Sequence, residues 1–239
     1  MTLQGRVILV TGATGGLGRA LAIECAAAGA TLILLGRSTP KLARVYDEVA
    51  TLGGPQPALA VLDLSTATAQ EYDQLAATIS AEFGKLDGIV HAAAILGDRS
   101  PLEQYDVPTW CKVLHVNLTA PFILTQVLLP NLRKSADASV IFVSSSVAKN
   151  ARPYWGAYAV SKGAVNSMSE MWSQELGGDR PIRVNSVNPG RIRTAMRAAA
   201  YPAEDPNTVT NPKAVCEIFL RLLSDEGRGI NGAYFDAQV

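Results

Sequence analysis

The sequence predicts an α/β fold in which a doubly wound parallel sheet is covered by helices on both faces. Two observations carry this prediction. Short apolar runs alternate along the chain with longer segments of helical spacing. The apolar runs are hydrophobic throughout instead of alternating with polar residues, which is typical of strands in a parallel sheet that is buried on both sides.

The individual elements follow from these two patterns in chain order. Residues 6–11 are rich in β-branched residues and end at a Gly-rich turn, so they are expected to form a strand, and the Ala-rich residues 17–28 are expected to form a helix. Further strands are expected at 30–36, 58–62, 88–92, 139–143, 182–186 and 233–235. Further helices are expected at 40–52, 68–83, 118–132, 157–176 and 212–223.

Length and composition favour a single domain over residues 1–239. The chain is 48% hydrophobic and 18% charged, enough to build a large core. No repeat or Pro/Ser-rich linker divides it. The irregular stretch is 191–211, which contains Pro202 and Pro206, and a long loop inside a compact domain is typically functional. We therefore expect 191–211 to be a substrate loop.

Charge and cysteine usage exclude several classes of protein. The chain has 21 basic and 21 acidic residues, so nucleic-acid and anionic-membrane partners are not expected. The most apolar stretches, 31–35 and 121–130, are shorter than the roughly 18 residues of a membrane span, and no export signal is visible. Three cysteines without CxxC spacing argue against a disulfide framework or a metal site, and a cytoplasmic protein is expected.

A Gly-rich turn at residues 11–18 follows the first expected strand and opens a helix. Residues without Cβ let the backbone approach a pyrophosphate, and the helix N-terminus favours negative charge there. The alternative is a tight turn that needs positive φ, but the flanking strand and helix favour a Rossmann-type dinucleotide site. The residues expected to contact the cofactor are Gly12, Thr14, Gly16, Leu17 and Gly18.

The second expected strand ends at Arg37, where a fold that prefers NAD usually has an acidic residue against the ribose. A guanidinium can bind a 2′-phosphate, so Arg37 predicts NADP(H), unless it is only a solvated surface residue. After the third strand, Asp63 could accept from the adenine amino group while the Leu64 amide donates. The alternative for Asp63 is a helix cap.

Tyr158 and Lys162 lie four residues apart in an expected helix, which places both side chains on one face. A nearby ammonium favours the phenolate and makes a tyrosine a better proton donor near neutral pH. This spacing also occurs by chance on helix surfaces. The pair is a candidate for acid–base catalysis.

The motifs together resemble the short-chain dehydrogenase/reductase family. The Thr-Gly-x-x-x-Gly-x-Gly turn, Asn117, serines after a strand, the Tyr-x-x-x-Lys pair and an Asn-Pro-Gly at 188–190 occur in the family's order across essentially the whole chain. Segments 155–158, 193–197 and 234–238 are most similar to the bacterial YciK-like oxidoreductases. The resemblance implies a homodimer or homotetramer built on the helices at 118–132 and 157–176.

The resemblance also implies catalytic roles. Tyr158 would be the general acid in reduction, Lys162 would lower its pKa and bind the nicotinamide ribose, and Asn117 would complete a proton relay through water. Ser145 would polarise the substrate carbonyl, because it precedes the tyrosine by the family's usual thirteen residues, and Ser146 is the alternate.

Residues 189–194 match the family's Pro-Gly-x-Ile-x-Thr motif, which implies cofactor contacts from Pro189, Gly190, Ile192 and Thr194. The sequence departs from the family at 91–94, where His-Ala-Ala-Ala replaces the usual Asn-Ala-Gly after the fourth strand. Ala92 cannot make the hydrogen bonds of an asparagine, and Ala94 adds a methyl near the cofactor ribose. We expect weaker local stability and cofactor binding there.

Other residues are left out of the predicted site or left open. His91 and His115 lack metal-ligand spacing and are expected to be core or helix histidines. Tyr154 and Trp155 could line a substrate pocket or pack between subunits. Arg193 and Arg197 could hold an acidic substrate group, although solvation is favoured.

The sequence as a whole predicts an NADP(H)-dependent oxidoreductase that moves a hydride between nicotinamide and a small carbonyl or secondary-alcohol substrate. One alternative is a non-catalytic NADP-sensing protein of the same fold, which the complete Ser, Tyr, Lys and Asn set disfavours. Another is a reductase of carbon–carbon double bonds. No pattern in the sequence identifies the substrate or the preferred direction.

Overall fold

A computed structural model describes residues 1–176 and 182–238. Within these residues, seven parallel strands form a sheet of order β3-β2-β1-β4-β5-β6-β7. The strands are β1 (Val7–Thr11), β2 (Thr31–Gly36), β3 (Ala58–Val61), β4 (Gly88–His91), β5 (Ala138–Val143), β6 (Ile182–Asn188) and β7 (Tyr234–Asp236). This order confirms the predicted doubly wound parallel sheet.

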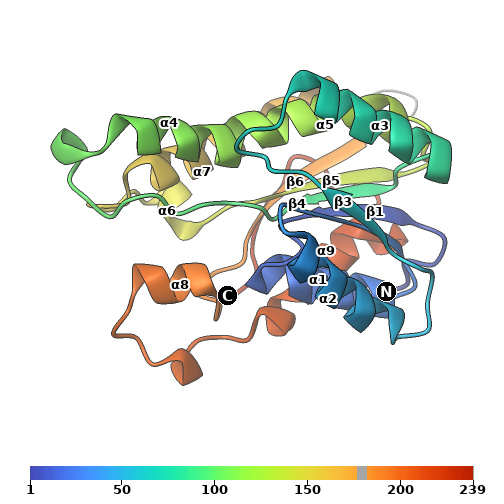
Figure 1. The fold of residues 1–239 in the computed structure, drawn as a ribbon, viewed down its shortest axis with the longest axis horizontal. Coiled ribbons are helices and arrows are strands. Elements are labelled where there is room, and N and C mark those ends of the chain that lie inside the picture. Colours follow the sequence, from blue (N-terminus) through green and yellow to red (C-terminus); the bar gives the residue numbers. More distant parts are fainter. Residues whose placement is uncertain (177–181, 239) are drawn as a thin grey trace.

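Helices cover both faces of the sheet (Figure 1). One layer contains α1 (Gly16–Ala27), α2 (Thr39–Ala50) and α9 (Cys216–Leu223). The opposite layer contains α3 (Ala69–Phe83), α4 (Val107–Leu114), α5 (Ala120–Leu132) and α7 (Gly156–Glu175). The elements predicted from the sequence agree with the structure to within two residues, with two exceptions. The helical run that ends at Leu132 begins earlier than predicted, and the α-helix that ends at Leu223 begins later.

The five inner strands, β1, β2, β4, β5 and β6, each contribute to two hydrophobic clusters, one on each face of the sheet. In β1, Ile8 and Val10 pack with α1 and α9, whereas Leu9 packs with α5 and α7 on the other side. All five β1 residues are buried. This two-sided burial is why the strands are apolar throughout.

The direction of winding reverses between β1 and β4. Strand β1 pairs with β2 on one side and with β4 on the other, so the connections that leave β1 and β4 diverge. In open α/β sheets, ligands bind outside the carboxyl ends of the strands at this switch point. The predicted site residues all follow carboxyl ends of strands or lie on helices beside them.

The helix expected at 118–132 begins eleven residues earlier. A continuous helical run covers α4, a π-helical turn at His115–Thr119 and α5. Asp106 caps its N-terminus by accepting a 2.8 Å hydrogen bond from the amide of Thr109. The predicted helix at 118–132 corresponds to α5, whereas α4 was not predicted, although the Asp-x-Pro-Thr sequence at its N-terminus is typical of a helix start.

From the sequence, no segment was expected to be long enough to span a membrane, and this helical run does not meet that expectation. Val107–Leu132 has 26 residues and a mean hydropathy of 1.4 in its most apolar window, which meets that criterion by length and composition. However, 44% of that window is buried inside the protein. Leu124 and Leu128 have no exposed surface and pack in the core, as in the central helix of an α/β fold.

The stretch 191–211 is folded, and its description as an irregular loop was wrong. It contains α8 (Ala195–Ala200) and a 3₁₀ turn at Pro206–Thr208, and a bridge between Ile192 and Thr210 joins its two ends. Figure 1 shows this segment extending below the sheet beside the C-terminal end. We call residues 191–211 the flap. A short helix, α6 (Ser146–Lys149), was also not predicted.

At the opposite edge of the sheet, Asp137 joins β1, β5 and β6. Its carboxylate accepts hydrogen bonds of 2.8 and 3.0 Å from Arg183, which is 3% exposed, and one of 3.0 Å from Arg6. Burial alone would raise the pKa of the Asp137 carboxyl, but the two arginines outweigh it and hold this pKa below its usual value.

Candidate active site

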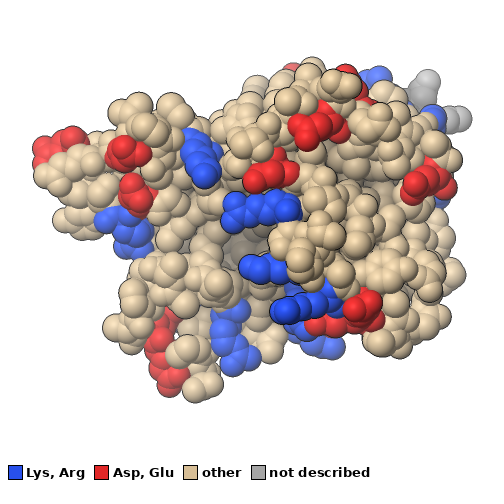
Figure 2. Space-filling model, viewed as in Figure 1, with Lys and Arg blue, Asp and Glu red and all other residues tan. Residues whose placement is uncertain are grey.

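A cavity of about 550 Å³ lies at the carboxyl edge of the sheet, at the switch point. Its size is typical of cofactor and small-molecule sites. It extends from the Gly-rich turn and the end of β2 to Tyr158 and Lys162 on α7. Figure 2 shows a hollow on this face, with Lys and Arg side chains gathered around it.

The Gly-rich turn is packed so tightly that side chains would not fit. Gly12 has φ +65°, and a Cβ there would lie 2.8 Å from the Cα of Ala93. A Cβ on Gly18 would overlap the carbonyl oxygen of Gly12. The backbone at the start of α1 is therefore open to a ligand, and Gly12, Thr14, Gly16, Leu17 and Gly18 all line the cavity.

Two cations stand at the far end of this cavity. Arg37 is exposed just after β2, and Lys41, in the first turn of α2, lines the same space. Sequence reasoning missed Lys41, although its spacing of four residues from Arg37 was visible. Together the two side chains give this end of the cavity a positive potential.

Asp63 lines the cavity and also stabilises its own turn. Its Oδ1 accepts hydrogen bonds of 2.9 Å from the amide and 2.7 Å from the hydroxyl of Ser65. These bonds, with the nearby charge of Arg37, lower the pKa of the Asp63 carboxyl. Asp63 therefore stabilises the turn that follows it, in line with the alternative of a capping residue. Leu64 lies beside Asp63 in the cavity wall.

Tyr158 lies in the cavity wall at the first turn of α7 and is 9% exposed. Burial raises the pKa of its phenol, and an interaction with the Ser145 hydroxyl offsets part of that effect. Ser145 faces this cavity, whereas Ser146 begins α6, is exposed and does not line it. The geometry therefore favours Ser145 over Ser146 as the partner of Tyr158.

Lys162 is almost completely buried one helical turn after Tyr158. Its Nζ donates a 2.7 Å hydrogen bond to the carbonyl oxygen of Val143 and lies 5.8 Å from the centre of the Tyr158 ring. Burial lowers the pKa of the Lys162 ammonium to about 8. The structure thus brings the ammonium, the phenol and Ser145 together, as the helical spacing predicts.

Asn117 lies in the π-helical turn, a feature often found at functional sites. Its Oδ1 accepts from the amide of Ile95 at 2.8 Å, and its Nδ2 donates to the Ile95 carbonyl at 2.9 Å and to the Ser161 hydroxyl at 3.1 Å. Ser161 in turn donates to the carbonyl of Tyr158 at 2.8 Å. The side chain clamps the segment after β4 to α7, so a water relay through Asn117 would have to use its main chain.

Residues after β6 form the remaining wall. Pro189, Gly190, Ile192 and Thr194 all line the cavity. The Thr194 hydroxyl accepts a 3.1 Å hydrogen bond from the amide of Arg197 and caps α8, and it keeps its own proton for donation. The site thus brings the Gly-rich turn, the wall after β6 and the Tyr158–Lys162 pair into one cavity.

Comparison with known proteins decides the family. The model of the short chain dehydrogenase family matches residues 6–205. The chain belongs to the short-chain dehydrogenases. It is 44% identical to the uncharacterized oxidoreductase YciK of Escherichia coli K12, with 99% of this chain and 93% of that protein covered.

Two other relatives of this short-chain dehydrogenase extend the comparison. A Shigella flexneri protein whose crystal structure is complexed with NADP is 43% identical, with a TM-score of 0.96 and coverage of 99% of this chain and 98% of that one. The 3-oxoacyl-[acyl-carrier-protein] reductase FabG of Thermotoga maritima is 32% identical, with 97% and 96% of the two chains covered. The chain is therefore an oxidoreductase by family.

The alanines that depart from the family pattern lie against the phosphate cradle. Ala93 packs on Gly12, and its amide donates a 3.0 Å hydrogen bond to the hydroxyl of Thr11. Asn117 holds Ile95 two residues further on. Thr11 and Asn117 thus anchor both ends of the segment that lacks an asparagine side chain. Weaker cofactor binding at Ala92 and Ala94 stays a prediction.

His91 is a core residue of this dehydrogenase. It is buried, its ring stacks on Phe142 at 4.7 Å between centroids, and its Nε2 lies 2.9 Å from the Thr125 hydroxyl. Burial, with the nearby charge of Lys162, lowers the pKa of His91 to about 3. His91 is therefore neutral at physiological pH, and neither it nor His115 lines the cavity among the described residues.

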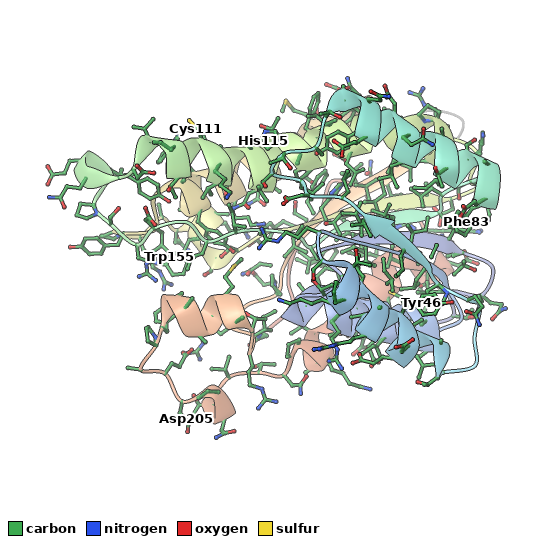
Figure 3. The ribbon with its side chains drawn as sticks, viewed as in Figure 1. Tyr46, Phe83, Cys111, His115, Trp155 and Asp205 are labelled. Carbon is green, nitrogen blue, oxygen red and sulfur yellow. The ribbon has the colours of Figure 1, made fainter. Side chains whose placement is uncertain are left out.

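Trp155 lies in the cavity wall and contacts the flap. Its ring lies 5.7 Å from that of Tyr158 and 6.0 Å from that of Tyr201, and Figure 3 places Trp155 between α6 and α8. Arg99 lies 4.3 Å from the Trp155 ring centre and donates to the carbonyl oxygens of Tyr154 and Ala200, each at 3.0 Å. Trp155 is thus a pocket residue, and Arg99 was missed because it lies far away in the sequence.

Proposed function

We propose that this short-chain dehydrogenase uses NADP(H) to interconvert small carbonyl compounds and secondary alcohols. The observation that carries the proposal is the meeting of Ser145, Tyr158 and Lys162 in the cavity that the Gly-rich turn and Arg37 also line. The flap would cover the substrate, and the chain would work as one domain.

The cavity fits a dinucleotide. Gly12 and Gly18 leave no room for Cβ atoms, so backbone amides at the start of α1 can approach a pyrophosphate. Arg37 and Asp63 would contact the adenosine half, and Ile192 and Thr194 the nicotinamide half, where Lys162 would bind the ribose. When bound, the reduced nicotinamide supplies two electrons and one hydrogen nucleus as a hydride.

The side chains supply the remaining proton and the electrostatic stabilisation. In the reductive direction, Tyr158 donates its phenolic proton to the carbonyl oxygen while the carbonyl carbon becomes a C–H carbon. The Ser145 hydroxyl donates a hydrogen bond to the same oxygen as negative charge develops on it. The Lys162 ammonium stabilises the phenolate that Tyr158 leaves, so burial of this cation beside the ring has a catalytic purpose.

A preference for NADP(H) is supported by the charges at the end of β2. Two cations, Arg37 and Lys41, border the cavity there, and Gly36 precedes Arg37 where an acidic residue would favour NAD. A guanidinium binds a phosphate with charge-assisted hydrogen bonds that a ribose hydroxyl cannot match.

The experiment is a parallel titration of the protein with NADPH and NADH, followed by quenching of tryptophan fluorescence and by energy transfer to the nicotinamide. We expect NADPH to bind about 10- to 100-fold more tightly, the range of one or more hydrogen bonds to a charged group. Arg37→Asp should level or reverse this preference. Equal affinities in the unmodified protein would contradict NADP(H) selectivity, and no binding of either would contradict the function.

We also propose a homodimer or homotetramer located in the cytoplasm. Three large apolar side chains are exposed on α5 and α7: Phe122 (38%), Val160 (48%) and Met171 (56%). Apolar side chains exposed on these two helices are available for burial in a subunit interface. The unpaired Cys25, Cys111 and Cys216 suit a reducing compartment. Light scattering of the purified protein, with Met171→Glu as an interface variant, tests the assembly.

A further inference from the structure

A second cavity, of about 640 Å³, opens beside Ser145. It shares Ser145, Trp155, Asn188, Gly190 and Arg197 with the cofactor cavity, but none of its described lining residues belongs to the Gly-rich turn. Residues of α6, the flap and the C-terminal segment form its other walls. A molecule whose reacting carbon lies at Ser145 could therefore extend into this second cavity, away from the Gly-rich turn.

The charged lining of the second cavity is unbalanced. Three arginines, Arg152, Arg191 and Arg197, face a single carboxylate, Glu204, among the described lining residues. Arg197 is committed to that carboxylate, because its Nε donates a 2.6 Å hydrogen bond to Glu204 Oε2 and a second nitrogen contacts Oε1. The Arg197 guanidinium also lies 3.7 Å from the centre of the Tyr201 ring. Its charge is thus neutralised inside the flap.

Two positive charges remain at this cavity. Within the described part of the chain, Arg152 and Arg191 form no ion pair, and both side chains are exposed at its edge. The opposite wall is apolar, since Val147 and Trp155 are buried there. Low-dielectric walls beside unpaired charges concentrate the positive potential inside a cleft. Glu204 feels the charge of Arg191 at a distance, but its carboxylate is already paired with Arg197. An anion that enters therefore meets two guanidinium groups that form no ion pair of their own within the described residues.

These two arginines are separate from the cofactor site. The basic residues that line the cofactor cavity are Arg37, Lys41, Lys112, Lys162 and Arg197, and Arg152 and Arg191 are not among its described lining residues. A role in binding the cofactor phosphates is therefore not supported. The flap residue Arg193 lines neither cavity within the described chain, so it offers a matched control of the same charge and segment.

We propose that the second cavity binds an oxyanion group of the substrate, such as a carboxylate, through Arg152 and Arg191. The substrate would then be a carbonyl compound, or the matching alcohol, whose anionic group lies on the side of the reacting carbon away from the cofactor. The oxyanion takes no part in the bonds that change. This inference rests on the proposed function and adds the charge of its substrate class.

The test compares two probes of the same shape, 4-carboxybenzaldehyde and its neutral methyl ester, by isothermal titration calorimetry. The protein is saturated with NADP⁺, which permits binding of an aldehyde without its reduction. We expect the acid to bind at least about 10-fold more tightly than the ester, the lower end of the range for hydrogen bonds to charged groups. Arg152→Gln and Arg191→Gln should each reduce this ratio, whereas Arg193→Gln should preserve it.

Equal dissociation constants for acid and ester, including no binding of either, would overturn the proposal. The proposal would also be overturned if Arg193→Gln lowered the preference for the acid over the ester as much as Arg152→Gln and Arg191→Gln do. The affinity for NADP⁺ is measured on each variant and should be unchanged. Loss of NADP⁺ binding by the unmodified protein would contradict the proposed function instead, so the two failures are distinguishable.

Discussion

Lys162 on α7 donates a 2.7 Å hydrogen bond to the carbonyl of Val143, the last residue of β5. This bond crosses from the helix layer to the sheet and fixes the ammonium next to the Tyr158 ring. A buried ammonium loses hydration, and one hydrogen bond to a neutral carbonyl replaces only part of it. The position is costly for the fold, and in the proposed reaction it would stabilise the phenolate of Tyr158.

The titration of Lys162 predicts a pH dependence of stability in the cofactor-free protein. Its pKa is about 8 in the folded chain and 10.5 in the unfolded chain, so between these values the unfolded chain binds more protons. The free energy of unfolding contributed by Lys162 should therefore rise with pH from about 8 to 10.5. Urea titrations of the protein and of Lys162→Met measure this, and a difference between them that is independent of pH would contradict it.

Tyr158→Phe should reduce turnover at least about 100-fold, within the range typical of general acid catalysis. The phenyl ring keeps the packing against Trp155, so the affinity for NADPH should change less than about threefold. Steady-state kinetics and the fluorescence titration separate the two effects. Tyr46→Phe is the control, since its hydroxyl bonds to Gln56 far from the cavity (Figure 3). Retention of most of the activity would exclude Tyr158 as the proton donor.

Gln238 is expected to position the loop after β6. Its Nε2 donates to the carbonyl oxygens of Pro189 at 2.7 Å and Arg191 at 3.1 Å, and its Oε1 accepts from the Thr210 hydroxyl at 3.0 Å. Gln238→Glu removes both donors and should weaken NADPH binding several-fold, with little change in Tm, because the residue is close to the chain end. Thr210→Val, which removes only the third bond, should have a smaller effect on affinity. Equal effects of the two variants would show that the donors to the loop are unimportant.

Asp137 should make the protein sensitive to acid. The pKa of this carboxyl lies below its usual value in the folded chain, so its contribution is complete above pH 4 and is lost as the pH falls through the folded value. Asp137→Asn leaves the buried Arg183 without its charge partner and should cost roughly 3–5 kcal/mol of unfolding free energy near neutral pH. Denaturant unfolding at pH 3 and pH 7 measures both. A variant as stable as the parent at pH 7 would contradict this role.

Local patterns were sufficient for most of the fold and for one side of the site. The all-apolar strands, the Gly-rich turn and the spacing of Tyr158 and Lys162 each depend on residues close together in the chain. The structure places all the predicted cavity residues except Asn117 directly in the cavity wall. Asn117 lies behind that wall, because its side chain bonds to Ile95 and Ser161 instead.

The flap shows where such patterns fail. Its helix α8 has six residues, too few for a clear hydrophobic period, and its order comes from the Arg197–Glu204 pair and the Ile192–Thr210 bridge. Prolines made the stretch look irregular, although proline is compatible with the first turn of a short helix. The interpretation of Arg197 as a solvated residue was wrong for the same reason.

The sequence by itself determined the parallel sheet, the Gly-rich turn and the placement of Tyr158 and Lys162 on one helix face, because strand burial, glycine turns and helical spacing are local properties. Only the tertiary structure decided which distant residues share a cavity. Arg152 and Arg191 are thirty-nine positions apart, and they meet beside Ser145 because β5 and β6 are neighbours whose carboxyl ends open at one edge of the sheet. The charge of a site depends on which distant residues lie together in the folded chain, and no single stretch of sequence shows this.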